Sequence, residues 1–130
     1  MNAPRSIRPI VSQDLLAKGT SDGEVVALEL RGTAELGAKD LLDDLFADAF
    51  DVSTRHRRVV VDLRRLEYMN SSSFKSMLTW LVRVRELPES QRPRIRFLSN
   101  PSFHWQRRSL HSLATMGGDL IEVEENPETP

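Results

Sequence analysis

The chain has 130 residues, 39% of them hydrophobic and 28% charged, with a formal net charge of −1 at pH 7. This length favours a single domain with a substantial core. The sequence contains no cysteine, which excludes disulfides, thiol catalysis and zinc–thiolate sites. No run approaches the ~20 apolar residues that a membrane-spanning helix needs, and the first residues lack the apolar core of a signal peptide. We therefore expect a cytoplasmic protein that does not associate with membranes.

Charge is distributed unevenly along the chain. Residues 20–51 hold nine acidic and two basic residues, whereas residues 55–108 hold thirteen basic and four acidic ones. The segment from Asp119 onward is acidic again. This asymmetry predicts either interaction surfaces of opposite sign or solvated faces that attract each other within the fold.

The first part of the chain predicts an arm, a hairpin and an amphipathic helix. Residues 1–9 contain two prolines and no periodic pattern, so we expect a flexible arm. Ile10–Lys18 and Glu24–Leu30 flank the turn cluster Gly19–Gly23 and predict two strands, the second ending at Gly32. Residues 36–50 then predict a helix with one apolar stripe and aspartates on the other side. The stripe is Leu41, Leu42, Leu45, Phe46, Ala49 and Phe50, and the aspartates are Asp40, Asp43, Asp44 and Asp48.

Strands and helices alternate through the rest of the chain. Arg58–Leu63 predicts a strand whose successive valines indicate burial on both faces. A helix over residues 72–87, a strand over 93–98, a helix opening at Ser102 and a strand over 119–123 follow. The second helix is expected to end before Pro88 and the third at Gly117–Gly118. The inward positions are expected to be Phe74, Met77, Leu78 and Leu81, then Leu110, Leu113 and Met116.

This order of elements, β-β-α-β-α-β-α-β, predicts an α/β fold. We expect a mixed sheet of four to five strands with the helices packed mainly on one face. The folded domain is expected to span residues 10–124, followed by a disordered acidic tail over residues 125–130.

A cluster of short polar residues stands before the second helix. After the connector Leu66–Met69, the sequence reads Asn70-Ser71-Ser72-Ser73. These residue types favour the N-cap of a helix. The backbone N–H groups there lack partners and the helix dipole is positive, so a phosphate is also well placed. Since a cap needs only one such residue, the cluster leaves two interpretations, a simple cap or a phosphorylated site.

The segment Val59–Leu63, followed by residues 66–73 and an apolar helix, resembles the STAS domain of bacterial anti-sigma factor antagonists. The order of elements matches that family over nearly the whole chain. In the family the loop usually reads Asp-Ser-Ser-Gly, and a kinase that is also an anti-sigma factor phosphorylates the first serine, while a phosphatase reverses this. By position, Ser71 matches that serine, Asn70 the aspartate and Ser73 the glycine. The two departures are similar to STAS-like regulators that carry asparagine followed by threonine or serine.

The resemblance implies a STAS-like fold and a non-enzymatic signalling protein with no cofactor, which exchanges protein partners when Ser71 is phosphorylated. The implied partners are a kinase of the anti-sigma type and a phosphatase. We expect the partner to contact Asn70, Ser72, Ser73, Lys75 and Thr79, and also the acidic face of the first helix. Lys75 and Thr79 share one helix face by their spacing. A phosphoserine adds a charge of about −1.5 to −2, so the switch would act by surface electrostatics.

Two other functions compete with this one. One is a constitutive STAS-like scaffold in which the serines only cap the helix. The other, less favoured, is a nucleic-acid-binding domain that uses the basic residues between 55 and 108. Its only aromatic support is Trp105-Gln-Arg-Arg108, which is weak evidence.

The remaining candidate residues favour structural roles. His56, His104 and His111 have no acid or thiolate to complete a metal site. Trp80 and Val84 predict either a hydrophobic shoulder beside the Ser71 loop or packing against a neighbouring helix. Neither a nucleophile elbow nor a P-loop occurs, so we do not expect an enzyme.

Overall fold

The computed structural model describes residues 7–12, 14–35, 37–53 and 58–125. These residues form one six-stranded mixed sheet in which the strands follow each other in chain order. The first two pairings are antiparallel and the later three are parallel. The α/β fold is confirmed, but the sheet has six strands rather than four or five. They are β1 (Ile10–Val11), β2 (Leu15–Ser21), β3 (Val25–Ala34), β4 (Arg58–Met69), β5 (Arg94–Ser99) and β6 (Ile121–Glu125).

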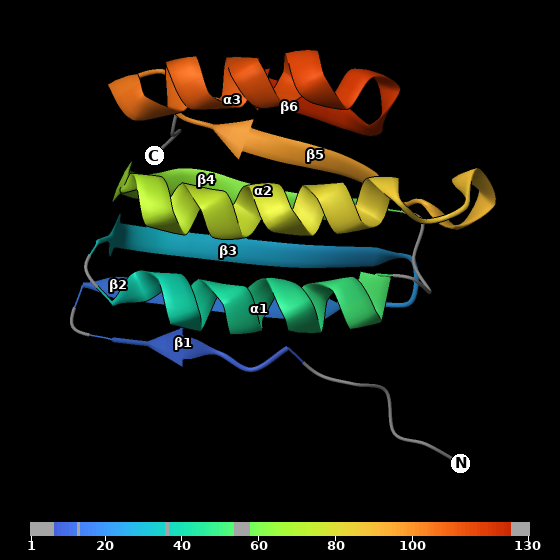
Figure 1. Cartoon of the computed structure of the whole chain (residues 1–130). Coiled ribbons are helices and arrows are strands. Elements are labelled where there is room, and N and C mark those ends of the chain that lie inside the picture. Colours follow the sequence, from blue (N-terminus) through green and yellow to red (C-terminus); the bar gives the residue numbers. More distant parts are fainter. Residues whose placement is uncertain (1–6, 13, 36, 54–57, 126–130) are drawn as a thin grey trace.

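Three helices connect the parallel strands, α1 (Ala38–Ser53), α2 (Ser71–Arg85) and α3 (His104–Gly117). Because right-handed crossovers between successive neighbours all move in one direction, they place the helices on the same face. Figure 1 shows α1 and α2 in front of the sheet and α3 over β6. The expectation that the helices cover mainly one face is therefore confirmed. Among the described residues, no helix has the length and apolar character to cross a bilayer.

The core lies between this helical layer and the sheet. Along β4, Val59, Val61 and Leu63 are fully buried and point toward the helices. Val60 points to the other face and is only partly buried, because no helix covers that side. Burial of the valine run on both faces was therefore the wrong expectation, and the outer face of the sheet is open.

Packing between α1 and α2 sets the orientation of α2. Trp80 and Val84 are buried, and the Trp80 ring stacks on Phe46 with centroids 5.1 Å apart. They therefore pack against the neighbouring helix rather than forming a shoulder beside the serine loop. Because this large ring turns α2 toward α1, Phe74 and Leu78 are only partly buried.

Three other predicted inward positions are also less buried than expected. Leu41 is 37% exposed and Met116 is 49% exposed. Phe50 is partly buried, and the Arg83 guanidinium lies 4.1 Å from the centre of its ring. Such a cation–π contact lets one face of the aromatic ring remain at the surface.

Part of the expected N-terminal arm contacts the domain. Ile7 is 7% exposed, and Arg8 donates three hydrogen bonds to the carboxylate of Asp48 at 2.8–3.1 Å. Residues 1–6 and 126–130 lie outside the described residues, so the flexible arm and the disordered tail stay predictions there.

β3 and β4 do not keep a uniform register. Glu29 pairs with Asp62 but Arg31 pairs with Arg65, and a second shift follows Gly32. β4 therefore has extra residues that bulge relative to β3. These bulges allow β4 to continue to Met69, past the predicted end at Leu63, so the expected connector over residues 66–69 is strand.

Gly32 lies at the second of these shifts and does not end β3 as predicted. Its φ is +93°, and a Cβ there would overlap the carbonyl oxygen of Asp14. The same carbonyl accepts a hydrogen bond from the Thr33 N–H at 2.8 Å. Only glycine fits this crossing of the two chain segments.

Candidate functional site

The carboxyl ends of the parallel strands and the starts of the helices meet at one edge of the sheet. β3, β4 and β5 end at Ala34, Met69 and Ser99, and each is followed by a helix (left side of Figure 1). In open α/β sheets this edge is where ligands bind. The polar cluster of residues 70–73 lies here.

Asn70 is the N-cap of α2. Its Oδ1 accepts a hydrogen bond from the Ser73 N–H at 2.9 Å. Its own N–H donates to the Ala34 carbonyl at the end of β3, 2.8 Å away, and its carbonyl accepts from the Phe74 N–H at 2.9 Å. The cap is thus made by one residue, and that residue also joins the helix start to the sheet.

Ser71 and Ser72 are the first two residues of α2, and both are exposed. Neither hydroxyl has a hydrogen-bond partner among the described residues. The backbone N–H groups at these first two positions have no partner within the helix, whereas that of Ser73 donates to the Asn70 side chain. The Ser71 and Ser72 side chains therefore do not cap the helix in this structure. The helix dipole makes the potential around them positive.

Ser73 occupies a different environment. It is fully buried, and its Oγ has no hydrogen-bond partner among the described residues. A buried hydroxyl at this depth is out of reach of a docked partner. Of the cluster, only Asn70, Ser71 and Ser72 are accessible for the predicted partner contact.

The exposed face of α2 continues from Ser71. Lys75 and Thr79 follow at intervals of four residues, and both are exposed. Lys75 forms no ion pair within the part of the chain that the structure describes. Val82, which is 46% exposed, extends the same face. We call Ser71, Lys75, Thr79 and Val82 the α2 stripe.

Two exposed apolar residues near the site were missed from the sequence. Val82 was overlooked because the rotation of α2 that exposes it depends on the Trp80–Phe46 stack. Tyr68, two residues before Asn70, is 45% exposed. It was placed in a connector, although a tyrosine next to a polar cluster is a usable signal for a contact surface.

The start of α1 is attached to α2 beside the site. The Lys39 ammonium lies 2.7 Å from the Asp43 carboxylate, and the Ser76 hydroxyl donates to the Lys39 carbonyl at 3.3 Å. Partial burial raises the pKa of Asp43, but the hydrogen bond and the positive charge of Lys39 outweigh it and hold the pKa below its usual value. Asp43 is therefore a fixed negative charge between the two helix starts.

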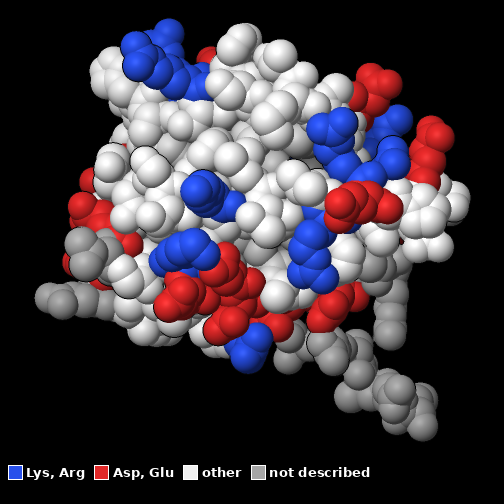
Figure 2. Space-filling view, viewed as in Figure 1, with Lys and Arg blue, Asp and Glu red and all other residues white. Residues whose placement is uncertain are grey.

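The acidic face predicted on α1 is partly neutralised. Asp43 pairs with Lys39, and Asp48 pairs with Arg8. Asp40 and Asp44 are exposed and make no ion pair within the described residues. Figure 2 shows acidic side chains gathered over α1, with most lysine and arginine side chains of the same face above them. The helical face thus offers a partner negative charge on its α1 side.

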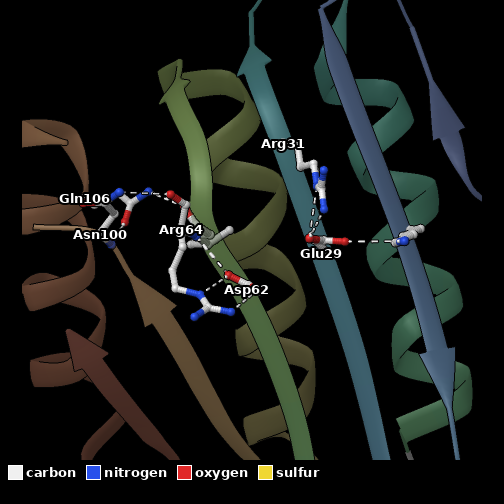
Figure 3. A network of polar contacts seen from close by, with 8 residues as sticks. Glu29, Arg31, Asp62, Arg64, Asn100 and Gln106 are labelled. Carbon is white, nitrogen blue, oxygen red and sulfur yellow. Dashed lines mark hydrogen bonds and ion pairs between the residues drawn. The ribbon is translucent and has the colours of Figure 1, made fainter. Parts of the chain in front are cut away.

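The start of α3 is attached to β4 by side chains. Gln106, which is 1% exposed, donates to the Leu63 and Leu66 carbonyls at 2.5 and 3.0 Å and accepts from the Asn100 N–H at 2.8 Å. The Asn100 amide donates to the Arg64 carbonyl at 3.2 Å. Figure 3 shows these residues beside the bulged part of β4. β4 pairs with β5 only as far as Asp62, and these side chains bind carbonyl groups of β4 beyond that pairing.

The metal and nucleic-acid candidates gain no support from the geometry. His104 and His111 are exposed on α3, and the described residues contain no cluster that could hold a metal ion. His56 lies outside the described residues. The Trp105 Nε1 donates to the Leu66 carbonyl at 3.0 Å, so this ring is packed at the helix start.

Comparison with known proteins gives structural likeness. No family model and no curated sequence matches the chain. An anti-sigma factor antagonist from Mycobacterium paratuberculosis superposes with a TM-score of 0.63 at 13% identity, covering 94% of this chain and 90% of that one. The anti-sigma factor antagonist SpoIIAA in its unphosphorylated form superposes with a TM-score of 0.57 at 19% identity, covering 85% of this chain and 89% of that one.

The phosphorylated form of SpoIIAA, a Bacillus cell fate determinant, gives a TM-score of 0.56 at 21% identity, covering 85% of this chain and 92% of that one. These TM-scores and coverages show a shared fold over most of each chain. The chain therefore has the fold of the anti-sigma factor antagonists, the STAS fold that the sequence resemblance implied.

Proposed function

We propose that this protein is a non-enzymatic signalling protein of the anti-sigma factor antagonist type, switched by reversible phosphorylation at Ser71. Its partners would be a kinase of the anti-sigma type and a phosphatase, in the cytoplasm. The observation that carries the proposal is that the residues of the polar cluster have different roles. Asn70 makes the cap, which leaves the exposed Ser71 hydroxyl without a structural role.

The local electrostatics favour a phosphate on this hydroxyl. The first backbone N–H groups of α2 have no intrahelical partner, and the helix dipole favours negative charge there. Lys75 stands four residues further along and has no ion pair among the described residues. A phosphate at Ser71 would pair with Lys75 across one helical turn. The domain would stay folded while the charge of the α2 stripe reverses.

The reversal of charge is the proposed mechanism of the switch. The partner surface would combine Asn70, Ser72, the α2 stripe and the acidic residues Asp40 and Asp44. A partner that accepts the positive Lys75 would be repelled once a phosphate adds about −1.5 to −2 charge beside it. One of the structural neighbours, SpoIIAA, is known in a phosphorylated and an unphosphorylated form, which supports a switch of this type.

The site of modification can be tested by co-expression with the genes that adjoin its own, followed by intact-mass measurement and phosphopeptide mapping. We expect a mass gain of one phosphate that is lost in Ser71→Ala and kept in Ser72→Ala. Ser72 is the matched control, since it is the adjacent helical residue, is also exposed, and its hydroxyl makes no hydrogen bond within the described residues. Modification that persists in Ser71→Ala would contradict the assignment.

The effect on binding is a separate test. Calorimetric titration with the partner so identified should show weaker binding for Ser71→Glu and unchanged binding for Ser71→Ala. Equal affinity of Ser71→Glu and the wild type would leave the alternative, a constitutive scaffold. Ser90→Glu, at an exposed serine outside the proposed partner surface, serves as the control for added negative charge.

A further inference from the structure

Two arginines lie directly opposite each other on the open face of the sheet. Arg58 is the first residue of β4 and Arg94 the first of β5, and the parallel register pairs them. Their neighbours Val59 and Ile95 are buried on the helical side, so the two arginine side chains belong to the outer face. Adjacent strands are about 4.8 Å apart. Two guanidinium groups therefore share one small area of surface.

Neither of these two like charges forms an ion pair within the described residues. Arg58 and Arg94 are exposed, and neither side chain has an ion pair or hydrogen bond there. Arg96, two residues along the same face of β5, instead pairs with Glu122 and Glu124 on β6, at 3.2 and 3.6 Å. Like charges directly opposite each other on neighbouring strands are destabilising. The nearby carboxylates of β6 are thus used by a third arginine.

The two arginines also line a hollow in the surface. Its volume is about 170 Å³, enough for a small anion with an organic substituent. Its apolar lining residues are Val25, Val59, Val60, Ile95 and Leu120. Its charged lining residues are Arg58, Arg94, Arg96, Asp119 and Glu122.

We propose that this hollow binds a phosphate group, free or carried by a small phosphorylated compound, which bridges Arg58 and Arg94. A guanidinium binds an oxyanion best with two parallel N–H···O bonds. A carboxylate has two oxygens and serves one such fork, whereas the several oxygens of a phosphate serve both. Bound phosphate would also remove the repulsion between the two arginines.

The site is independent of the proposed switch. Arg58 and Ser71 lie at opposite ends of β4, which spans twelve residues and therefore roughly 40 Å. Loss of the Ser71 switch would leave this proposal standing, and the reverse also holds.

The test is thermal unfolding of the full chain at constant ionic strength, with chloride exchanged for inorganic phosphate at low millimolar concentration. Low concentration matters because phosphate salts stabilise proteins generally when concentrated. We expect a saturable rise in Tm for the wild type. Arg58→Gln and Arg94→Gln should each raise the half-saturating concentration by about tenfold. Arg107→Gln removes an exposed arginine of α3 that makes no ion pair within the described residues, and it should respond like the wild type.

A variant with the opposite sign sharpens the test. Asp119 is a carboxylate of the lining that makes no ion pair within the described residues. Asp119→Asn should therefore lower the half-saturating concentration, whereas Asp44→Asn on α1 should not. Without phosphate, Arg94→Gln should raise Tm by about 1 °C, since it relieves the repulsion.

Sedimentation with vesicles containing phosphatidic acid is a second arm and distinguishes a lipid headgroup from a free phosphate. Binding that depends on Arg58 and Arg94 in either arm supports the site. The arm in which it occurs shows whether the phosphate is free or belongs to a lipid headgroup. The proposal is overturned if Arg58→Gln and Arg94→Gln respond to phosphate as the wild type does. It is also overturned if Arg107→Gln loses as much as they do, or if neither arm shows binding.

Discussion

The starts of α2 and α3 lie at the same edge of the sheet but are held there by different means. α2 begins with a side-chain cap from Asn70, whose bonds reach only its own helix and the end of β3. α3 begins after Phe103, which makes no side-chain cap bond, and Gln106 joins it to β4 instead. The local cap at α2 leaves the side chains of Ser71 and Ser72 without hydrogen bonds in the described chain. At α3 the side chains of Trp105 and Gln106 are themselves bound to β4. This difference explains why the Ser71 and Ser72 hydroxyls are exposed and make no hydrogen bond within the described residues.

The largest effect should come from breaking the attachment of α3. Gln106→Leu keeps the side-chain volume but leaves the Leu63 carbonyl and the Asn100 N–H unpaired in a buried place, while Trp105 still binds the Leu66 carbonyl. We expect a loss of about 3 kcal/mol in the free energy of unfolding, measured by urea denaturation. Gln91→Leu, at an exposed glutamine, is the control. A loss below about 1 kcal/mol would show that Gln106 does not carry this attachment.

Removing the cap of α2 should cost less. Asn70→Ala deletes one hydrogen bond at the helix start, so we expect a loss of about 1 kcal/mol in unfolding free energy. Asn70→Asp keeps the acceptor and adds a negative charge at the positive end of the dipole, and it should be as stable as the wild type. The same denaturation experiment measures both. Equal stability of the alanine variant and the wild type would mean that another residue caps the helix.

The network around α3 also predicts a dependence on pH. Partial burial raises the pKa of Asp62, but bonds from the Arg64 side chain and N–H outweigh it and hold the pKa below its usual value. A lowered folded-state pKa means that this stabilisation is complete above the unfolded value of about 3.9 and is lost as the pH falls through the folded value.

The free energy of unfolding of the wild type should therefore exceed that of Asp62→Asn by about 0.5 kcal/mol at neutral pH. The difference should disappear in strong acid, as the pH falls below the lowered pKa of Asp62. Unfolding free energies measured at several pH values check this. Asp44→Asn, at an exposed carboxylate without an ion pair in the described residues, is the matched control. A difference that stays constant down to the lowest pH would contradict the role of the Asp62 charge.

The smallest effect is expected at Ser71. Since Asn70 makes the cap and the Ser71 hydroxyl has no partner in the described chain, Ser71→Ala should change unfolding free energy by less than about 0.5 kcal/mol. Ser71→Asp should be equally stable or slightly more so, because the first turn favours acids. Thermal and urea unfolding measure both variants. A loss of about 1 kcal/mol in the free energy of unfolding of Ser71→Ala would show that the Ser71 hydroxyl contributes to the N-cap.

The sequence predicted the order of elements because their periodicity is strong, and it located the polar cluster at a helix start. It missed the length of β4 because bulges break alternation, so that Leu63, Leu66 and Met69 recur every third residue and resemble no strand. It merged β1 with β2, since a two-residue strand has no periodicity of its own. These features depend on contacts between distant segments.

The site was predicted less completely than the fold. Spacing placed Lys75 and Thr79 on one exposed face, as the structure has them. Local preferences could not decide which of four cap-competent residues makes the cap, because that depends on where β4 ends. The burial of Ser73 and the exposure of Val82 follow from the rotation of α2 by Trp80, which is set by Phe46 on another helix.

The crossing at Gly32 bears on how this protein would look in a mutational survey. Every substitution there forces a side chain into the Asp14 carbonyl and a strained backbone, so the position should tolerate nothing but glycine. Ser71 should accept many residues in any screen that scores folded protein. Intolerance to mutation would therefore identify Gly32, where two chain segments cross, and would not identify Ser71, the proposed switch. Only a screen that scores partner binding would reverse that ranking.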